Sequence, residues 1–257
     1  MRYVLFFAAA SLAFAQSTPD LNGVWKVNKE KSKMSGMMAQ ADSYASVQQS
    51  GSKIEVKTIT MGEHFEQRGD WKYDTSGAET TNEFRGTKLA TKSAWEGGAL
   101  VIDMTGTDDG REVKIHETWT PSADGNSLTR VENNGRGETT MVFDKSPESA
   151  SVFTAAPRMA KDVYQNIKDL NVPAYRVGEV MENFSNALGV RCGFCHVQGN
   201  FASDEKHEKQ FARTMLVMTN GINHDVFHDH FRVSCYTCHR GQKEPPMHPE
   251  AASNAGH

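Results

Sequence analysis

Two short motifs contain the residues whose types and spacing point to chemistry. They run from Cys192 to His196 (CGFCH) and from Cys235 to His239 (CYTCH). In C-x-x-C-H, both thiols form thioethers to the vinyl groups of a haem, and the His binds its iron. Two intervening residues close one tight turn, so both sulfur atoms reach the same edge of the macrocycle. The sequence therefore predicts two covalently attached haem c groups.

The cysteines are all accounted for by these motifs. Cys192, Cys195, Cys235 and Cys238 are the only cysteines in the chain, and His196 and His239 are the predicted proximal iron ligands. Paired cysteines at this spacing also occur in zinc sites, redox dithiols and disulfides. None of these alternatives explains why a His follows the second Cys both times, so haem c is the favoured interpretation.

The helical segments before the motifs repeat each other at a spacing of 34 residues. Met181, Phe184 and Leu188 correspond in this way to Met215, Met218 and Ile222. A Met at the same place in both copies suits a thioether ligand, which raises the potential of a haem relative to two imidazoles. The repeat therefore predicts Met181 as the sixth ligand of the first haem and Met215 as that of the second.

Other ligands for the second haem stay open. Met218 lies one turn from Met215 on the same predicted face, and a Met on such a face also serves as core filler. The segment between the repeat and the second motif adds His224, His228 and His230. Any of these three would give a haem with two His ligands.

The N-terminal residues indicate the location of the protein, and its net charge limits the kinds of partner that it binds. Residues 1–15 combine one Arg, an apolar run and a small-residue cleavage site, which predicts a secretory signal peptide. Export agrees with haem c, which is attached outside the cytoplasmic membrane, so a periplasmic or otherwise exported protein is expected. A net charge of −4 and the lack of a basic face argue against nucleic-acid binding. No later stretch resembles a transmembrane segment.

The chain changes character near residues 147–157, which predicts an α+β protein of two domains. Before this point, ten short alternating segments are separated by tight-turn pairs such as Asp124-Gly125, as in an antiparallel meander. The expected organisation is a signal peptide (1–15), an antiparallel β-barrel-like domain (20–146), a linker (147–157), a mainly α-helical dihaem domain (158–246) and a flexible tail (247–257). The segment Leu21–Val27 resembles the start of lipocalin-like barrels. Such a barrel either holds a small apolar ligand or is filled by side chains.

Three helices are expected after the linker. Apolar residues at helical spacing predict one over Met159–Leu170 and another over Val177–Leu188, ended by Gly189. Ser203 is the predicted N-cap of a third helix, with its apolar face along Phe211–Ile222.

The helical region resembles the cytochrome c subunit of photosynthetic reaction centres. The resemblance lies in Met181–His196, Asn200–Asp204 and Cys235–Gly241, and it covers roughly Asp162 to Pro246. It implies haems that pass electrons to an oxidised partner. The four-haem family has four motifs, whereas this chain matches the last two. Of these, the earlier haem takes a Met ligand, and the later takes a His from a region that is lacking here.

These observations favour an exported dihaem cytochrome that relays electrons between redox partner proteins, with no catalytic residues of its own. The resemblance is to dihaem relatives carrying only this half of the family, so photosynthesis is not implied. A peroxidase-like enzyme, with an open position at the second haem, is the alternative. A third class is a sensor whose barrel binds a small ligand.

Overall fold

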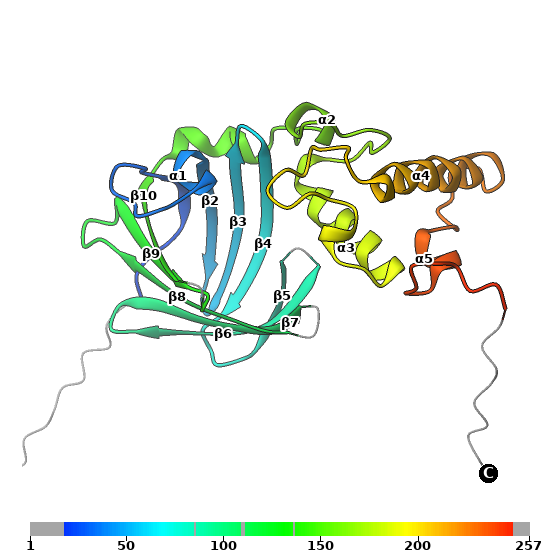
Figure 1. Cartoon of the computed structure of the whole chain (residues 1–257). Coiled ribbons are helices and arrows are strands. Elements are labelled where there is room, and N and C mark those ends of the chain that lie inside the picture. Colours follow the sequence, from blue (N-terminus) through cyan, green and yellow to red (C-terminus); the bar gives the residue numbers. More distant parts are fainter. Residues whose placement is uncertain (1–17, 85, 109–110, 136, 249–257) are drawn as a thin grey trace, which may run out of the picture.

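The computed structural model describes residues 18–84, 86–108, 111–135 and 137–248 (Figure 1). It shows a strongly curved antiparallel sheet followed by a helical region, which confirms the predicted α+β class. The predicted signal peptide lies outside the described residues, as does most of the predicted tail.

Ten strands form the sheet, and each pairs with its neighbour in the sequence except at one place. They are β1 (Gly23–Val27), β2 (Asp42–Ser50), β3 (Lys53–Gly62), β4 (Phe65–Asp74), β5 (Thr80–Phe84), β6 (Thr87–Glu96), β7 (Ala99–Asp108), β8 (Arg111–Pro121), β9 (Ser127–Asn133) and β10 (Glu138–Lys145). The hydrogen-bonded order is β4-β3-β2-β1-β10-β9-β8-β7-β6-β5. A short helix, α1 (Met37–Gln40), lies between β1 and β2. All ten predicted strands are present.

Side-chain hydrogen bonds join β4 and β5, the two edge strands of the sheet. The Asn82 amide accepts a hydrogen bond from the Lys72 backbone N–H at 2.7 Å and donates one to the Lys72 carbonyl at 2.9 Å. The Thr80 hydroxyl donates to the same carbonyl at 2.7 Å. Asn82 is buried, and a buried amide is stable only with such partners. The sheet is therefore nearly closed into a barrel.

The inward faces of the strands form one apolar cluster. It includes the fully buried Trp25, Ile54, Leu100 and Ile102, which come from strands spread around the barrel. The Trp25 indole N–H is satisfied by the Leu21 carbonyl at 2.9 Å. The alternation of polar and apolar residues seen in the sequence thus fills the barrel with side chains.

The helical region is built of short pieces and two longer helices. They are η1 (Pro147–Phe153), α2 (Ala160–Val163), η2 (Ala174–Arg176), α3 (Val177–Leu188), η3 (Cys192–Phe194), α4 (His207–Asp225) and α5 (Cys235–His239). The predicted end of α3 at Gly189 is correct, because Gly189 has a left-handed backbone with φ 64°. Within the described part of the chain, no helix is long and apolar enough to cross a membrane.

Two predicted helix features are wrong. The helix expected over Met159–Leu170 is only the four-residue α2, because the backbone becomes extended at Tyr164, and Asn166 and Asp169 then have left-handed backbones, with φ 62° and 57°. The Asn166 amide donates hydrogen bonds to the Ala202 carbonyl and to Asp204, and this tertiary contact outweighs the helical pattern. Ser203 is not an N-cap, since α4 begins after Lys206.

A buried carboxylate joins the barrel to the helical region. The side chain of Glu66 on β4 is fully buried and accepts hydrogen bonds from Arg68 Nε at 2.8 Å and Arg158 Nε at 3.0 Å. Arg158, just before α2, also donates to the carbonyls of Gly62 and Phe65 at 3.1 and 2.8 Å. The segment after the barrel is therefore fixed to the hairpin between β3 and β4.

This junction predicts a stability effect. Arg158→Met should lower the free energy of unfolding by about 2 kcal/mol, because it leaves Glu66 buried with one charge-assisted partner fewer. Urea unfolding followed by the circular dichroism of the sheet measures this. Arg176→Met, which breaks the exposed pair with Glu179, is the matched control and should change stability by less than about 0.5 kcal/mol. Equal effects would contradict the assigned role of Arg158.

Candidate functional site

The first motif forms a tight turn directly after α3. Its first three residues make η3, and the His196 backbone N–H bonds back to the Cys192 carbonyl at 3.0 Å. Cys192 is exposed, Cys195 is half-buried, and both thiols are free. Both sulfur atoms thus belong to the same turn as His196. Burial raises the pKa of the Cys195 thiol.

The His196 ring is oriented by the loop that follows it. Its Nδ1 lies 3.1 Å from the Phe201 carbonyl, which only accepts hydrogen bonds, so Nδ1 carries the proton. The Phe201 ring packs edge-on at 5.3 Å between centroids. This arrangement leaves Nε2 as the lone-pair nitrogen, and a hydrogen bond at the other nitrogen is the usual support for a metal-binding His.

The second motif has the same design. Cys235–His239 is the short helix α5, and Arg240 ends it with a left-handed backbone at φ 53°. Its thiols, Cys235 and Cys238, are free as well. His239 Nδ1 lies 3.1 Å from two carbonyls, those of Gln242 and Lys243. Its Nε2 is therefore also the lone-pair nitrogen.

This set of donors fits a covalently attached haem better than a zinc ion. Each turn offers two thiols and one His with a defined tautomer, which are the groups needed to hold haem c. Exposed aromatic side chains lie next to both motifs: Phe201 packs against His196, and Tyr236 is part of α5. Among the described residues, no three His, Cys, Asp or Glu side chains converge as a metal site.

The two motifs are in contact through their flanking backbone. The Gly241 N–H donates to the Ala187 carbonyl at 2.9 Å, and a Cβ added to Gly189 would lie 2.1 Å from the Gly241 carbonyl oxygen. Lys243 Nζ lies 4.9 Å from the centre of the Phe194 ring. The end of α3 thus packs against the end of α5, as Figure 1 shows for these two helices. The backbone after the second motif therefore fixes the start of the first.

The predicted sixth ligands lie on both long helices. Met181 is half-buried on α3, whereas Met215 and Met218 are exposed on α4. His224 lies in the last turn of α4, where its Nδ1 is 2.9 Å from Asp229, and that carboxylate raises the His224 pKa. His228 and His230 follow in the exposed turn after α4. The assignment of the sixth ligands therefore stays a prediction.

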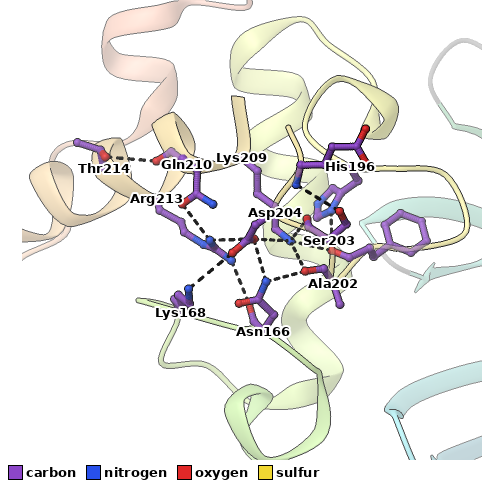
Figure 2. Close-up of polar contacts among 12 residues, drawn as sticks. Asn166, Lys168, His196, Ala202, Ser203, Asp204, Lys209, Gln210, Arg213 and Thr214 are labelled. Atoms are coloured by element: carbon purple, nitrogen blue, oxygen red, sulfur yellow. Dashed lines mark hydrogen bonds and ion pairs between the residues drawn. The ribbon is translucent and has the colours of Figure 1, made fainter. Parts of the chain in front are cut away.

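A charged cluster supports the loop between the first motif and α4 (Figure 2). Asp204 lies 3.0 Å from Arg213 Nη1, 3.3 Å from Lys209 Nζ and 3.6 Å from Lys168 Nζ. The Asn166 amide donates to the same carboxylate at 2.8 Å. The Arg213 hydrogen bond, with those of Lys209 and Asn166, holds the Asp204 pKa well below its usual range.

Sequence reasoning gave this cluster no role. Lys209 and Arg213 are four residues apart, so they share one face of α4, and this spacing was the available signal. Asn166, which is 38 residues from Asp204 in the chain, bonds to the same carboxylate. Only the tertiary structure brings these groups together.

The contact between the motifs predicts the effect of adding a single methyl group. Gly189→Ala should destabilise the helical region by more than ~1 kcal/mol, because a residue with a Cβ adopts the left-handed backbone only at a cost and the new Cβ meets the Gly241 carbonyl. Gly178→Ala, at a helical position of α3 with nothing within 4 Å of the added Cβ, is the control. It should stabilise by up to ~1 kcal/mol. Thermal unfolding followed by helical circular dichroism separates the two. A Gly189→Ala protein as stable as wild type would refute the contact.

The Asp204 cluster predicts a dependence on pH. Since the folded pKa of Asp204 lies below its unfolded value of about 4, the carboxylate stabilises the fold above this pH. That stabilisation is lost as the pH falls through the folded pKa. Asp204→Asn should therefore lower the unfolding temperature at pH 7, and the difference from wild type should shrink below about pH 4. A difference that is constant with pH would show that the charge is not involved.

One protein family and several relatives match part of this chain. The family described as "Photosynthetic reaction centre cytochrome C subunit" matches residues 116–253. The reaction center cytochrome c subunit of Thermochromatium tepidum is 37% identical over an alignment of 104 residues, and the match covers 38% of this chain and 26% of the relative. Cytochrome c-554 of Chloroflexus aurantiacus is 41% identical over an alignment of 61 residues, and the match covers 21% of this chain and 14% of the relative.

Some solved structures are similar to about half of this chain. The "REP1-NXSQ fatty acid transporter" has a TM-score of 0.38 at 14% identity, covering 49% of this chain and 96% of its own. "Human cRBP IV" has a TM-score of 0.38 at 15% identity, covering 50% of this chain and 99% of its own.

The family match spans more than half of the chain and includes both C-x-x-C-H motifs. The chain spans between a quarter and a third of the length of the reaction-centre subunits that it matches. The resemblance seen in the sequence is confirmed: this chain belongs to the family of photosynthetic reaction centre cytochrome c subunits.

Proposed function

We propose that the protein is an exported dihaem c-type cytochrome that transfers electrons between redox partner proteins. The observation that carries the proposal is a pair of C-x-x-C-H turns in backbone contact, each with its His Nδ1 held by a carbonyl. Two such turns side by side suit two haems that exchange electrons. Membership of the cytochrome family supports covalent haem c as the cofactor.

Each part of the site has a defined task in this function. Bound haem supplies a one-electron couple between ferrous and ferric iron. The four cysteines anchor the two groups, and His196 and His239 present Nε2 because their other ring nitrogen is held by the backbone. The contact of Gly189 with Gly241 fixes one motif relative to the other.

The sixth ligands that we propose are Met181 for the first haem and Met215 for the second. Both lie on helices, α3 and α4, and occupy equivalent places in the 34-residue repeat. Met218 corresponds to Phe184 in the repeat, and Phe offers no ligand atom. A thioether ligand on each iron would give both haems relatively high potentials and would leave neither with an open position.

The barrel is proposed to act as a docking module rather than as a ligand carrier. Its inward side chains form one packed cluster that includes Trp25, Leu100 and Phe143. The Glu66–Arg158 junction ties it to the helical region, so a partner bound to the barrel is held at a fixed place relative to the haem motifs. Export through residues 1–15 places the protein in the periplasm or beyond it.

A peroxidase-like enzyme is the competing class, and the matched relatives do not support it. They carry the names of cytochrome c subunits and of a cytochrome c-554. An enzyme of this class needs a sixth position that is open or easily vacated. Rapid binding of carbon monoxide by the ferrous protein would favour the enzyme, and resistance to it favours electron transfer.

The number of haems is the first test. The mature protein should keep two haem increments in its intact mass after acid–acetone extraction, because thioethers survive this treatment. A Cys192→Ser/Cys195→Ser variant and a Cys235→Ser/Cys238→Ser variant should each keep one. Bound zinc, or the loss of all haem on extraction, would refute the proposal.

The sixth ligands are tested by spectroscopy. Met181→Ala should remove the Met–iron charge-transfer band of one haem, and Met215→Ala that of the other, because each deletes a thioether ligand. Met218→Ala is the matched control on α4 and should leave both bands. A second haem with two His ligands that His224→Ala, His228→Ala or His230→Ala disrupts would show that Met215 only packs.

A further inference from the structure

Lys209 is a buried ammonium that binds the loop after the first motif. It lies in the first turn of α4, and only 11% of its side chain is exposed. Its Nζ donates to three successive carbonyls, those of Phe201, Ala202 and Ser203, at 2.9, 3.1 and 2.7 Å. An ammonium has three N–H donors, so these bonds engage all of them. Asp204, 3.3 Å away, partly balances the charge.

One of these carbonyls also orients the predicted iron ligand. The Phe201 oxygen accepts from Lys209 Nζ at 2.9 Å and from His196 Nδ1 at 3.1 Å. A single oxygen therefore lies between the ammonium and the imidazole. Any change in its electron density alters the hydrogen bond to His196.

We propose that Lys209 is a positioning residue that raises the reduction potential of the first haem by sharing the Phe201 carbonyl with His196. This inference rests on the proposed dihaem function. A strong hydrogen bond at Nδ1 makes a His ligand more basic, and a basic ligand favours ferric iron. Lys209 draws electron density from the same oxygen, weakens its bond to His196 and so favours the ferrous state.

The charge of Lys209 acts in the same direction. A buried positive charge interacts more strongly with its surroundings than an exposed one, since the local dielectric constant is lower. It disfavours the extra positive charge of ferric iron. Removing Lys209 should therefore lower the potential by both routes.

Lys168 provides a control for the loss of one positive charge from this cluster. Its Nζ lies 3.6 Å from Asp204, and its side chain is 56% exposed. Lys168→Met removes one positive charge from the same cluster without removing a donor to Phe201. Lys209→Met removes the charge and the donor together.

The experiment measures the potentials of both haems in the purified holoprotein by spectroelectrochemical titration. Lys209→Met should lower the potential of the first haem, shifting the electron-partition constant between the haems by about tenfold, or ~59 mV for a one-electron couple. Lys168→Met should shift it much less, and the second haem should be unchanged in both. Lys209→Arg, which keeps charge and N–H donors, should restore the wild-type value.

A second readout follows the hydrogen bond itself. The proton NMR signal of His196 Nδ1–H should move downfield in Lys209→Met, as its bond to Phe201 strengthens, and stay in place in Lys168→Met. If Lys209→Met does not retain the first haem, Lys209→Leu, which also lacks both the charge and the N–H donors, should give the same lowered potential.

Two results would overturn the inference. One is an unchanged first-haem potential in the neutral Lys209 variants, and the other is an equal shift in Lys209→Met and Lys168→Met. Wild-type protein with two covalent haems keeps the proposed function in either case. A wild-type protein without two haems would refute the proposed function itself.

Discussion

The arrangement of the helical region depends on the contact between the end of α3 and the backbone after α5. Gly189 and Gly241 approach so closely that a side chain on Gly189 would collide with a carbonyl oxygen. Gly189 precedes the first motif by three residues, and Gly241 follows His239 by two. The contact therefore lies between the two turns that carry the thiols and the His residues. Only glycine tolerates both the left-handed backbone and the close approach at this position. The packing of the two motifs against each other therefore requires glycine at residue 189.

Two clusters of charged side chains stabilise different parts of the molecule. In the barrel, Glu66 is fully buried and is stabilised by Arg68 and Arg158, so a carboxylate fixes the start of the helical region. Beside the first motif, Asp204 gathers cations from α4 and from the segment before α3. Both clusters join segments that are far apart in sequence. The second reaches the His196 ring through the Phe201 carbonyl, so it links loop stability to the properties of an iron ligand.

The barrel and the helical region are stabilised by different kinds of interaction. The barrel is stabilised by buried apolar area and by a nearly continuous ladder of backbone hydrogen bonds, with side chains completing it between β4 and β5. The helical region has little regular structure outside α3 and α4, and its loops are fixed by side chains bonded to carbonyls. Such loops can hold groups at set orientations without a large core, which suits a domain whose main contents are cofactor motifs.

The sequence alone determined the ten strands, the α+β class, the family and the C-x-x-C-H motifs, because alternation and fixed local spacings are properties of neighbouring residues. It also placed the end of α3 at Gly189 correctly. It predicted a long helix after Met159, whereas the chain leaves the helix at Tyr164 and Asn166 bonds to Ala202 and Asp204, which lie far along the chain. The contact of the two motifs and the carbonyl shared by His196 and Lys209 were decided by the tertiary structure alone. They depend on backbone atoms, which every residue has, so no pattern of side-chain types reveals them.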